Sequence, residues 1–176
     1  KDDEKLIDAK IPALENTGNT DLEKRVNYEI MLKMNEVQEE AEERAAQYKN
    51  AVIETGGTEE DYQPITIQID YKVGYSSDKV VSFVILKSET LASAYTERFF
   101  YNIDIESGKE LNLRDVLGND YKQIVDETIY KEIEERSKNP NNSYFTKDEG
   151  GFSGIENEYQ NFYINSEGKV VIVFEK

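Results

Sequence analysis

The feature that most constrains the fold is a long stretch of helical periodicity in the first third of the chain. Over residues 21–53, apolar residues recur at intervals of three and four, as they do along one face of an α-helix. Thr20 or Asn19 can cap the start, and the Gly56-Gly57 pair can end it. The pattern therefore predicts a long amphipathic helix. Its expected buried face comprises Leu22, Val26, Ile30, Met34, Val37, Ala41 and Ala45.

Three segments after this helix show the patterns of half-buried strands. Residues 65–73 alternate an apolar face with a polar one, residues 79–90 form a second apolar run after a turn, and residues 95–105 alternate again. Three successive strands predict an antiparallel meander. Residues 4–14 carry a short apolar pattern interrupted by Pro12, which suits an edge strand or an extended lead-in. The core face expected for the first strand comprises Ile65, Ile67, Ile69, Tyr71 and Val73.

The remainder of the chain predicts a second helix and a terminal hairpin. Residues 111–118 read as a short strand that leads into a helical turn, and the helix that follows must stop near Ser137 because of Pro140. Residues 139–154 form an irregular loop rich in Gly, Asn and aromatic residues, and loops of this length are often functional. A hairpin is expected across residues 166–168.

Together these elements predict an α+β fold, an antiparallel sheet with a long N-terminal helix and a second helix packed on it. We expect residues 1–60 to hold the lead strand and long helix, and residues 61–176 to hold the sheet, second helix and C-terminal hairpin, in one compact domain. No apolar run approaches about 18 residues, and the chain opens at Lys1 without a Met. We therefore expect a piece of a longer protein whose anchor lies outside this chain.

The composition excludes several kinds of chemistry. The chain has 21 Lys and Arg against 37 Asp and Glu, a net charge of −16, and it contains no His, Cys or Trp. His-assisted Ser or Cys nucleophiles, zinc sites with nitrogen and sulfur ligands, haem and thiol redox chemistry are therefore excluded. We expect no cofactor and no metal. The negative field disfavours nucleic acid and anionic lipid, and it favours a basic protein as partner.

Acidic and aromatic clusters leave several interpretations open. Residues 36–43 carry five Glu, which form either a solvated helix face or a docking surface for a basic partner. Carboxylates near Gly108 and at residues 147–150 lack the spacing of a Ca²⁺ loop, and a carboxylate-based hydrolase would need two of them about 5 to 10 Å apart. The expectation is a protein that is not an enzyme. Aromatic residues gather in residues 144–163, either as ordinary packing or as an interface.

Several stretches resemble the extracellular domain of the RsiV-type anti-sigma factors of Gram-positive bacteria. They are residues 88–117, residues 133–145, residues 161–164 and residues 170–176. The resemblance extends over nearly the whole chain. The first part, with Lys10-Ile-Pro12, the long helix and the alternating strand, is similar to the module found ahead of the catalytic domain in peptidoglycan deacetylases of the PdaC type.

This resemblance implies a sensor on the extracellular face of the cell membrane. In that family, a single-span protein holds the sigma-V factor inactive through a cytoplasmic segment, which is absent from this chain, and its outer domain binds lysozyme. Binding exposes the full-length protein to signal peptidase, and an intramembrane protease completes release of the sigma factor. The charge argument agrees, because lysozymes of this class are basic and a domain at −16 would attract one.

The resemblance also implies a binding surface. The matching positions predict protein-binding roles for Ser93, Tyr95, Asn161 and Tyr163. Related domains often carry Gly-Gly-Ala-His where this chain has Ala-Ser-Ala-Tyr at residues 92–95, so any contribution of that His is missing here. The alternative function is that of a non-catalytic, glycan-binding module of a peptidoglycan deacetylase.

Overall fold

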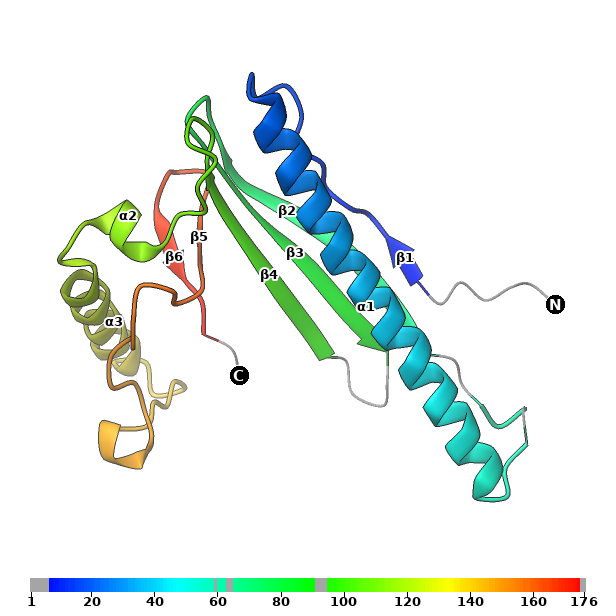
Figure 1. Ribbon diagram of the computed structural model, residues 1–176. Coiled ribbons are helices and arrows are strands. Elements are labelled where there is room, and N and C mark those ends of the chain that lie inside the picture. Colours follow the sequence, from blue (N-terminus) through cyan, green and yellow to red (C-terminus); the bar gives the residue numbers. More distant parts are fainter. Residues whose placement is uncertain (1–6, 59, 63–64, 91–94, 175–176) are drawn as a thin grey trace.

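The computed structural model describes residues 7–58, 60–62, 65–90 and 95–174 (Figure 1). Helices and strands combine in an α+β fold, as predicted. The elements in chain order are β1 (Ile7–Ala9), α1 (Thr20–Glu54), β2 (Thr66–Ser76), β3 (Val80–Thr90), β4 (Tyr95–Asp104), α2 (Leu113–Leu117), α3 (Tyr121–Ser137), a 3₁₀ turn (Lys147–Glu149), β5 (Phe162–Ile164) and β6 (Val170–Ile172).

Four strands form the main sheet in the order β1-β2-β3-β4. β2, β3 and β4 are antiparallel neighbours, which confirms the predicted meander. β1 is an edge strand that runs parallel to β2, with Ile7 opposite Ile67 and Ala9 opposite Ile69. The sheet is therefore mixed rather than wholly antiparallel. The cause is the connection, because α1 carries the chain back along the sheet between β1 and β2 and the second strand then runs in the same direction as the first.

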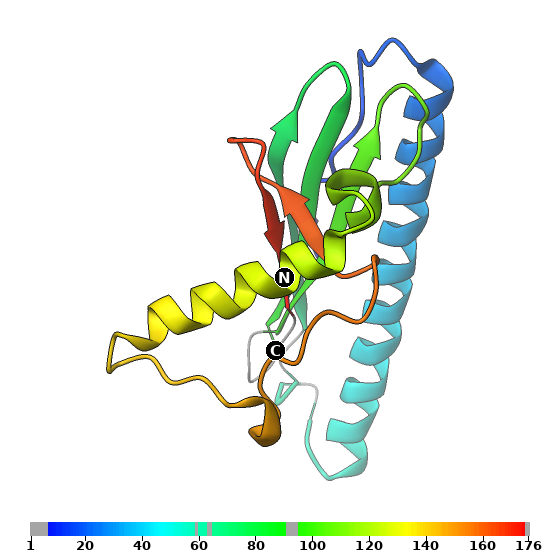
Figure 2. The same ribbon diagram turned by 90° about the vertical axis from the view of Figure 1, so that its left-hand side faces the viewer.

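α1 lies along one face of the main sheet and buries the predicted stripe (Figure 2). All seven predicted positions, from Leu22 to Ala45, are buried. Asn19 caps the helix, since its side chain accepts a hydrogen bond from the backbone N–H of Leu22 at 3.0 Å. The helix ends at Glu54, just before the predicted Gly56-Gly57 pair. The sheet side of this core contains Ile65, Ile67, Ile69, Val81, Phe83, Ile85, Ile103 and Ile105.

The prediction of the core face of β2 is wrong at two residues. Tyr71 and Val73 are 40% and 51% exposed, whereas Ile67 and Ile69 before them on the same face are buried. The reason is the extent of β1, which stops at Ala9. After Ala9 the chain turns away from β2 towards the start of α1. Among the described residues, the second half of β2 therefore has no neighbouring strand at this edge.

The C-terminal part builds a second, smaller core on the other face of the main sheet (Figure 2). β5 and β6 pair as the predicted antiparallel hairpin. α3 contributes Tyr121 and Val125 from its first turns, and the rest of this helix extends away from the sheet into the irregular loop at residues 139–154. The second core comprises Leu113, Tyr121, Val125, Ile155, Phe162 and Ile164, with Tyr75 and Val80 from the ends of β2 and β3 packed against them.

Candidate functional site

The sequence predicts binding residues in two separate segments, and the structure describes one of them. Ser93 lies outside the described residues, and of Tyr95 only the backbone, at the start of β4, is described. Asn161 immediately precedes β5 and is exposed, and Tyr163 in the middle of β5 is half-buried. The described part of the candidate site is therefore built around β5.

β5 crosses the main sheet instead of joining it, and two buried polar side chains hold it there. Asn102 of β4 donates from Nδ2 to the backbone oxygen of Phe162 at 2.9 Å. Ser82 of β3 accepts from the backbone N–H of Ile164 at 2.8 Å and donates to Asn102 Oδ1 at 2.8 Å. Because these groups are buried, each would cost free energy if it lost its partner. The network fixes β5, and the predicted residues on it, to β3 and β4.

A glycine in β2 allows this close crossing. A Cβ atom at Gly74 would lie 2.2 Å from the backbone oxygen of Ile164 and 3.3 Å from Cδ2 of Tyr163. A side chain at this position would therefore push β5 away from β2. The β2–β3 register shifts between Val73 and Tyr75, so Gly74 lies in a bulge. The ring of Tyr163 thus lies against the backbone of β2.

Beside this crossing, a groove of about 310 Å³ runs between β4 and the segment that leads into β5. Asn161 lines the groove, together with Tyr159, whose side chain is 76% exposed. The other lining residues are Phe100, Asn102, Glu110, Leu111, Asn112, Glu158, Gln160 and Phe162. Carboxylates, amides and an exposed aromatic ring together suit the polar or basic side chains of a protein partner.

Two carboxylates of this groove differ in their pKa. Burial raises the pKa of Glu110, and the negative charge of Glu29 on α1 adds to the shift, although a neighbouring arginine opposes it. A hydrogen bond from its own backbone N–H lowers the pKa of Glu158, and the nearby charge of Arg114 and the hydroxyl of Tyr121 add to this shift. The Tyr121 hydroxyl donates to Glu158 at 3.2 Å. Glu158 therefore keeps its negative charge to lower pH than Glu110.

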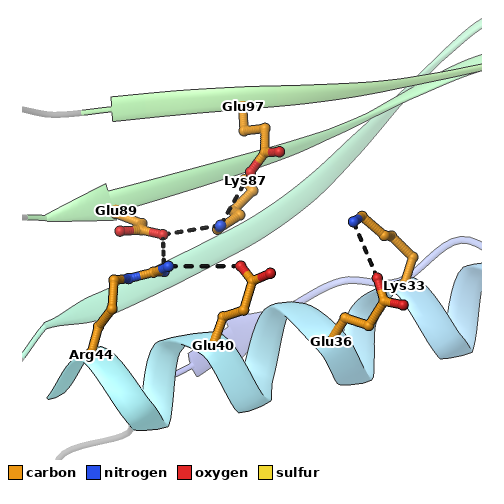
Figure 3. Close-up of polar contacts among 7 residues, drawn as sticks. All are labelled: Lys33, Glu36, Glu40, Arg44, Lys87, Glu89 and Glu97. Atoms are coloured by element: carbon orange, nitrogen blue, oxygen red, sulfur yellow. Dashed lines mark hydrogen bonds and ion pairs between the residues drawn. The ribbon is translucent and has the colours of Figure 1, made fainter. Parts of the chain in front are cut away.

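At the opposite end of β3 and β4, an ion-pair network ties the sheet to α1 (Figure 3). Lys87 is buried, and its Nζ lies 3.0 Å from a carboxylate oxygen of Glu89 and 3.1 Å from one of Glu97. Arg44 of α1 reaches the same Glu89 at 2.6 Å and Glu40 at 3.7 Å. Burial alone would lower the pKa of Lys87, but the two glutamates outweigh it and raise this pKa. The end of β3 and the start of β4, which flank residues 91–94, are thus fixed to the helix.

The two predicted segments lie at opposite ends of β4. Tyr95 is the first residue of this strand, and Asn102, which holds β5, lies seven residues further on. At the rise of an extended strand this corresponds to about 23 Å. A ligand that contacts both segments must be extended, which suits a protein surface or a polymer better than a small molecule.

The acidic residues near Gly108 have structural partners. Asp104 accepts hydrogen bonds from the hydroxyl and the backbone N–H of Ser107, both at 2.6 Å, and these bonds lower its pKa. Asp115 accepts a hydrogen bond at 3.0 Å from the backbone N–H of Asn112, the N-cap residue of α2, and pairs with Lys109 at 2.5 Å. In the part of the chain that the structure describes, no three Asp or Glu side chains gather as they would around a metal ion.

Sequence reasoning missed Ser82 and Asn102, which position the described half of the site. Both interrupt apolar runs on their strands, and both stand opposite each other in the register of β3 and β4. A buried polar pair facing away from the main core is a local signal that something polar crosses that face. The partner atoms, however, are backbone groups some 60 to 80 residues away in the sequence.

The fold is shared with a protein of known structure. A crystal structure of a member of the DUF3298 family from Bacteroides fragilis NCTC 9343 aligns with a TM-score of 0.53 and 16% sequence identity. The alignment covers 75% of this chain and 59% of that one. At this level of identity the likeness shows the fold alone.

The family follows from sequence matches. The family model described as Deacetylase PdaC matches residues 1–89, half of the chain, and the chain belongs to that family. It is also similar to the anti-sigma-V factor RsiV of Bacillus subtilis (strain 168), with 25% identity over 178 positions that cover 99% of this chain. These findings support an RsiV-type domain, as the resemblance in the sequence indicated. The chain spans 58% of the length of that relative. Among the described residues, no helix has the length and apolar character needed to cross a membrane.

Proposed function

We propose that this chain is the extracellular sensor domain of a membrane-bound anti-sigma factor and that it binds lysozyme. The observation that carries the proposal is the similarity to RsiV, which covers 99% of the chain and so includes both cores. Binding then triggers cleavage of the full-length protein by signal peptidase and by an intramembrane protease. The sigma factor, held by a segment outside this chain, is released. The domain itself is a receptor and not an enzyme.

The charge of the domain supports a basic ligand. At −16 the chain attracts and orients a cationic protein, which raises its association rate at low salt. Exposed carboxylates on α1, such as Glu39 and Glu43, contribute to this field. A net charge raises the association rate but does not by itself distinguish one basic protein from another. A receptor therefore also needs a binding surface that is complementary to its ligand in shape.

We propose that the contacts of this surface come from Asn161 and Tyr163 at the crossing, together with Ser93 and Tyr95 at the other end of β4. The side-chain amide of Asn161 makes no hydrogen bond to the described residues and is exposed, so it can bond to a partner. Tyr163 is held against β2, and a tyrosine fixed in this way binds with little loss of conformational entropy. About 23 Å separates Tyr95 from Asn102 along β4, a span that a protein surface can cover.

A glycan-binding module is the second candidate. The match of the deacetylase family to residues 1–89 favours it, and so do the rings of Phe145 and Tyr159, both 76% exposed. Phe145 follows a run of Asn residues, and exposed rings beside amide groups are suited to stack on and bond to sugars. If the domain is a glycan-binding module, its ligand is a peptidoglycan strand.

Titration calorimetry with a basic c-type lysozyme at low and moderate salt tests the proposal, with cytochrome c as a basic control protein. We expect a 1:1 complex with lysozyme that survives moderate salt and no such complex with the control. If both proteins bind equally and salt abolishes the binding, the negative charge of the domain attracts any basic protein. This result would refute the proposal that the domain is a lysozyme receptor. Binding of soluble peptidoglycan fragments without binding of lysozyme would favour the second candidate.

Matched variants locate the surface. Asn161→Ala should weaken lysozyme binding by about tenfold, roughly 1.4 kcal/mol. Asn141→Ala removes another exposed amide, on the loop that follows α3, and should leave the affinity unchanged. An equal effect of the two substitutions would contradict the proposed surface. Tyr163→Ala should weaken binding further, with circular dichroism as the check that β5 keeps its place.

A further inference from the structure

The exposed apolar residues of β2 identify a second surface, on the opposite face of the sheet from the proposed lysozyme site. Tyr71 and Val73 continue the alternation of Ile67 and Ile69 and therefore face the same side of the sheet, yet they are 40% and 51% exposed. Together with the apolar groove beside them they form a contiguous exposed apolar patch, which is more informative than a single exposed residue. Their exposure indicates that this half of β2 lacks a covering segment.

The same half of β2 also has an open edge. β1 pairs with β2 only opposite Ile67–Ile69, and in the described part of the chain no strand lies beside the rest of that edge. The backbone N–H of Lys10 donates to the backbone oxygen of Ile69 at 2.8 Å, so odd-numbered residues of β2 direct their backbone groups to this edge. The backbone N–H and oxygen of Val73 therefore point outward. Such groups form a template for an added strand.

A groove of about 410 Å³ runs along this edge. The lead-in at residues 12–17, which connects β1 to α1 (Figure 1), forms its far wall. This wall is fixed independently of β2, because Asn27 of α1 accepts from the backbone N–H of Leu14 at 2.7 Å and donates to its oxygen at 3.0 Å. The buried apolar side chains that line the groove are those of Leu14, Val81, Phe83 and Ile105.

The charge of the groove indicates which kind of ligand it can bind. Glu15 and Asp78 are the charged side chains among the lining residues, and both are acidic. A second copy of this chain, at −16, would bring more negative charge to the groove. A peptide with alternating apolar side chains and a Lys or Arg at its ends complements both the apolar floor and the acidic walls.

We propose that this groove binds an extended, basic segment of a partner protein, which adds as a strand to the free edge of β2. Its backbone pairs with Val73, its apolar side chains cover Tyr71 and Val73, and its terminal cations lie near Glu15 and Asp78. Asn161 and Tyr163 lie at the crossing of β5 on the opposite face of the sheet, although the ring of Tyr163 approaches Gly74, the residue after Val73. The partner can therefore differ from lysozyme.

Fluorescence anisotropy with a defined peptide series tests the proposal. The probes are fluorescein-labelled heptapeptides of the form Lys-X-Thr-X-Thr-X-Lys, where X is Val, Ile, Leu, Phe or Tyr. We expect saturable binding of at least one peptide and a loss of about tenfold or more when its X residues are N-methylated, since methylation removes strand-forming N–H groups. Failure of every peptide to bind would overturn the proposal.

Two charge-matched variants separate this site from unspecific attraction. Val73→Lys places a cation in the groove and should weaken the peptide by about tenfold or more. Met31→Lys introduces the same positive charge at a side chain of similar exposure on α1, and it should leave peptide binding unchanged. Equal losses in the two variants would overturn the proposal. So would a dimer of the wild-type chain that Val73→Lys dissociates, because the occupant would then be a second copy. Unchanged lysozyme binding by Val73→Lys would show that the two sites are separate.

Discussion

The buried lysine of the network in Figure 3 gives the sharpest test of what holds α1 to the sheet. Lys87 is 3% exposed and lies within 3.1 Å of both Glu89 and Glu97. Lys87→Met keeps the length of the side chain and removes its charge. Breaking a buried ion pair on one side costs about 3–5 kcal/mol, because the other charge stays buried without its partner. Here Arg44 still pairs with Glu89, and Glu97 is exposed enough to regain water, so we expect about 2–3 kcal/mol.

The matched control is Lys33→Met on α1, the helix that the Lys87 network ties to the sheet. Lys33 pairs with Glu36 at 3.2 Å, where water reaches both side chains, and such pairs contribute about 0.5 kcal/mol. Its Nζ also lies 5.4 Å from the centre of the Phe99 ring, a contact that adds about 0.5–1 kcal/mol. Both variants remove one positive charge, so the effect on the overall field is the same. Urea unfolding followed by circular dichroism should show a midpoint about 1–1.5 M lower for Lys87→Met, at a slope of about 2 kcal/mol/M. Midpoints that agree between the two variants would refute the view that burial makes this pair strong.

Three further predictions concern the β5 crossing and its groove. Gly74→Ala should destabilise the fold by about 2 kcal/mol because its Cβ meets a backbone oxygen of β5. Thermal unfolding of Gly150→Ala, with open space at its Cβ, should show only the smaller cost, about 1 kcal/mol, of a side chain in the left-handed region. Asn102→Ala should cost about 2–3 kcal/mol in urea unfolding, since it leaves two buried partners without their bonds. Burial raises the pKa of Glu110, so its ionised form opposes folding. Glu110→Gln should therefore raise the melting temperature at pH 7, and the gain should fade as the pH falls through the raised pKa and vanish below about 4.5. A gain that persists unchanged at low pH would contradict this cause.

The helix and the meander could be predicted from the sequence because their signals are local. Seven apolar residues at helical spacing, from Leu22 to Ala45, describe one face without reference to any partner, and all are buried. Alternation likewise places Ile67 and Ile69 in the core. It fails at Tyr71, because alternation reports which side of the strand a residue faces and not how far the neighbouring strand extends. That extent depends on where β1 ends, and β1 is separated from β2 by the whole of α1.

The site was less accessible to sequence reasoning than the fold. Asn161 and Tyr163 are predicted as binding residues only from the family resemblance, whereas the residue pattern around them predicts only a hairpin. What positions them is the pair Ser82 and Asn102 and the bulge at Gly74, which meet β5 through contacts between distant parts of the chain. A single polar residue in a strand carries no information about its partner. The distance along β4 between the two predicted segments also became clear only once the register of the strands was known.

The charge that attracts a basic ligand also opposes folding of the free domain, so salt should act on the two processes in opposite directions. Local pairs such as Arg25–Glu29 and Arg136–Glu132 offset only a few tenths of a kcal/mol each, which leaves most of the repulsion at −16 in place. Added salt screens this repulsion, and the melting temperature of the free domain should rise with NaCl. The same screening should slow association with a basic protein while its dissociation rate changes little. A fall in melting temperature with salt would show instead that favourable ion pairs, such as those of Lys87, outweigh the net charge. Parallel thermal and kinetic titrations over the same salt range distinguish the two cases.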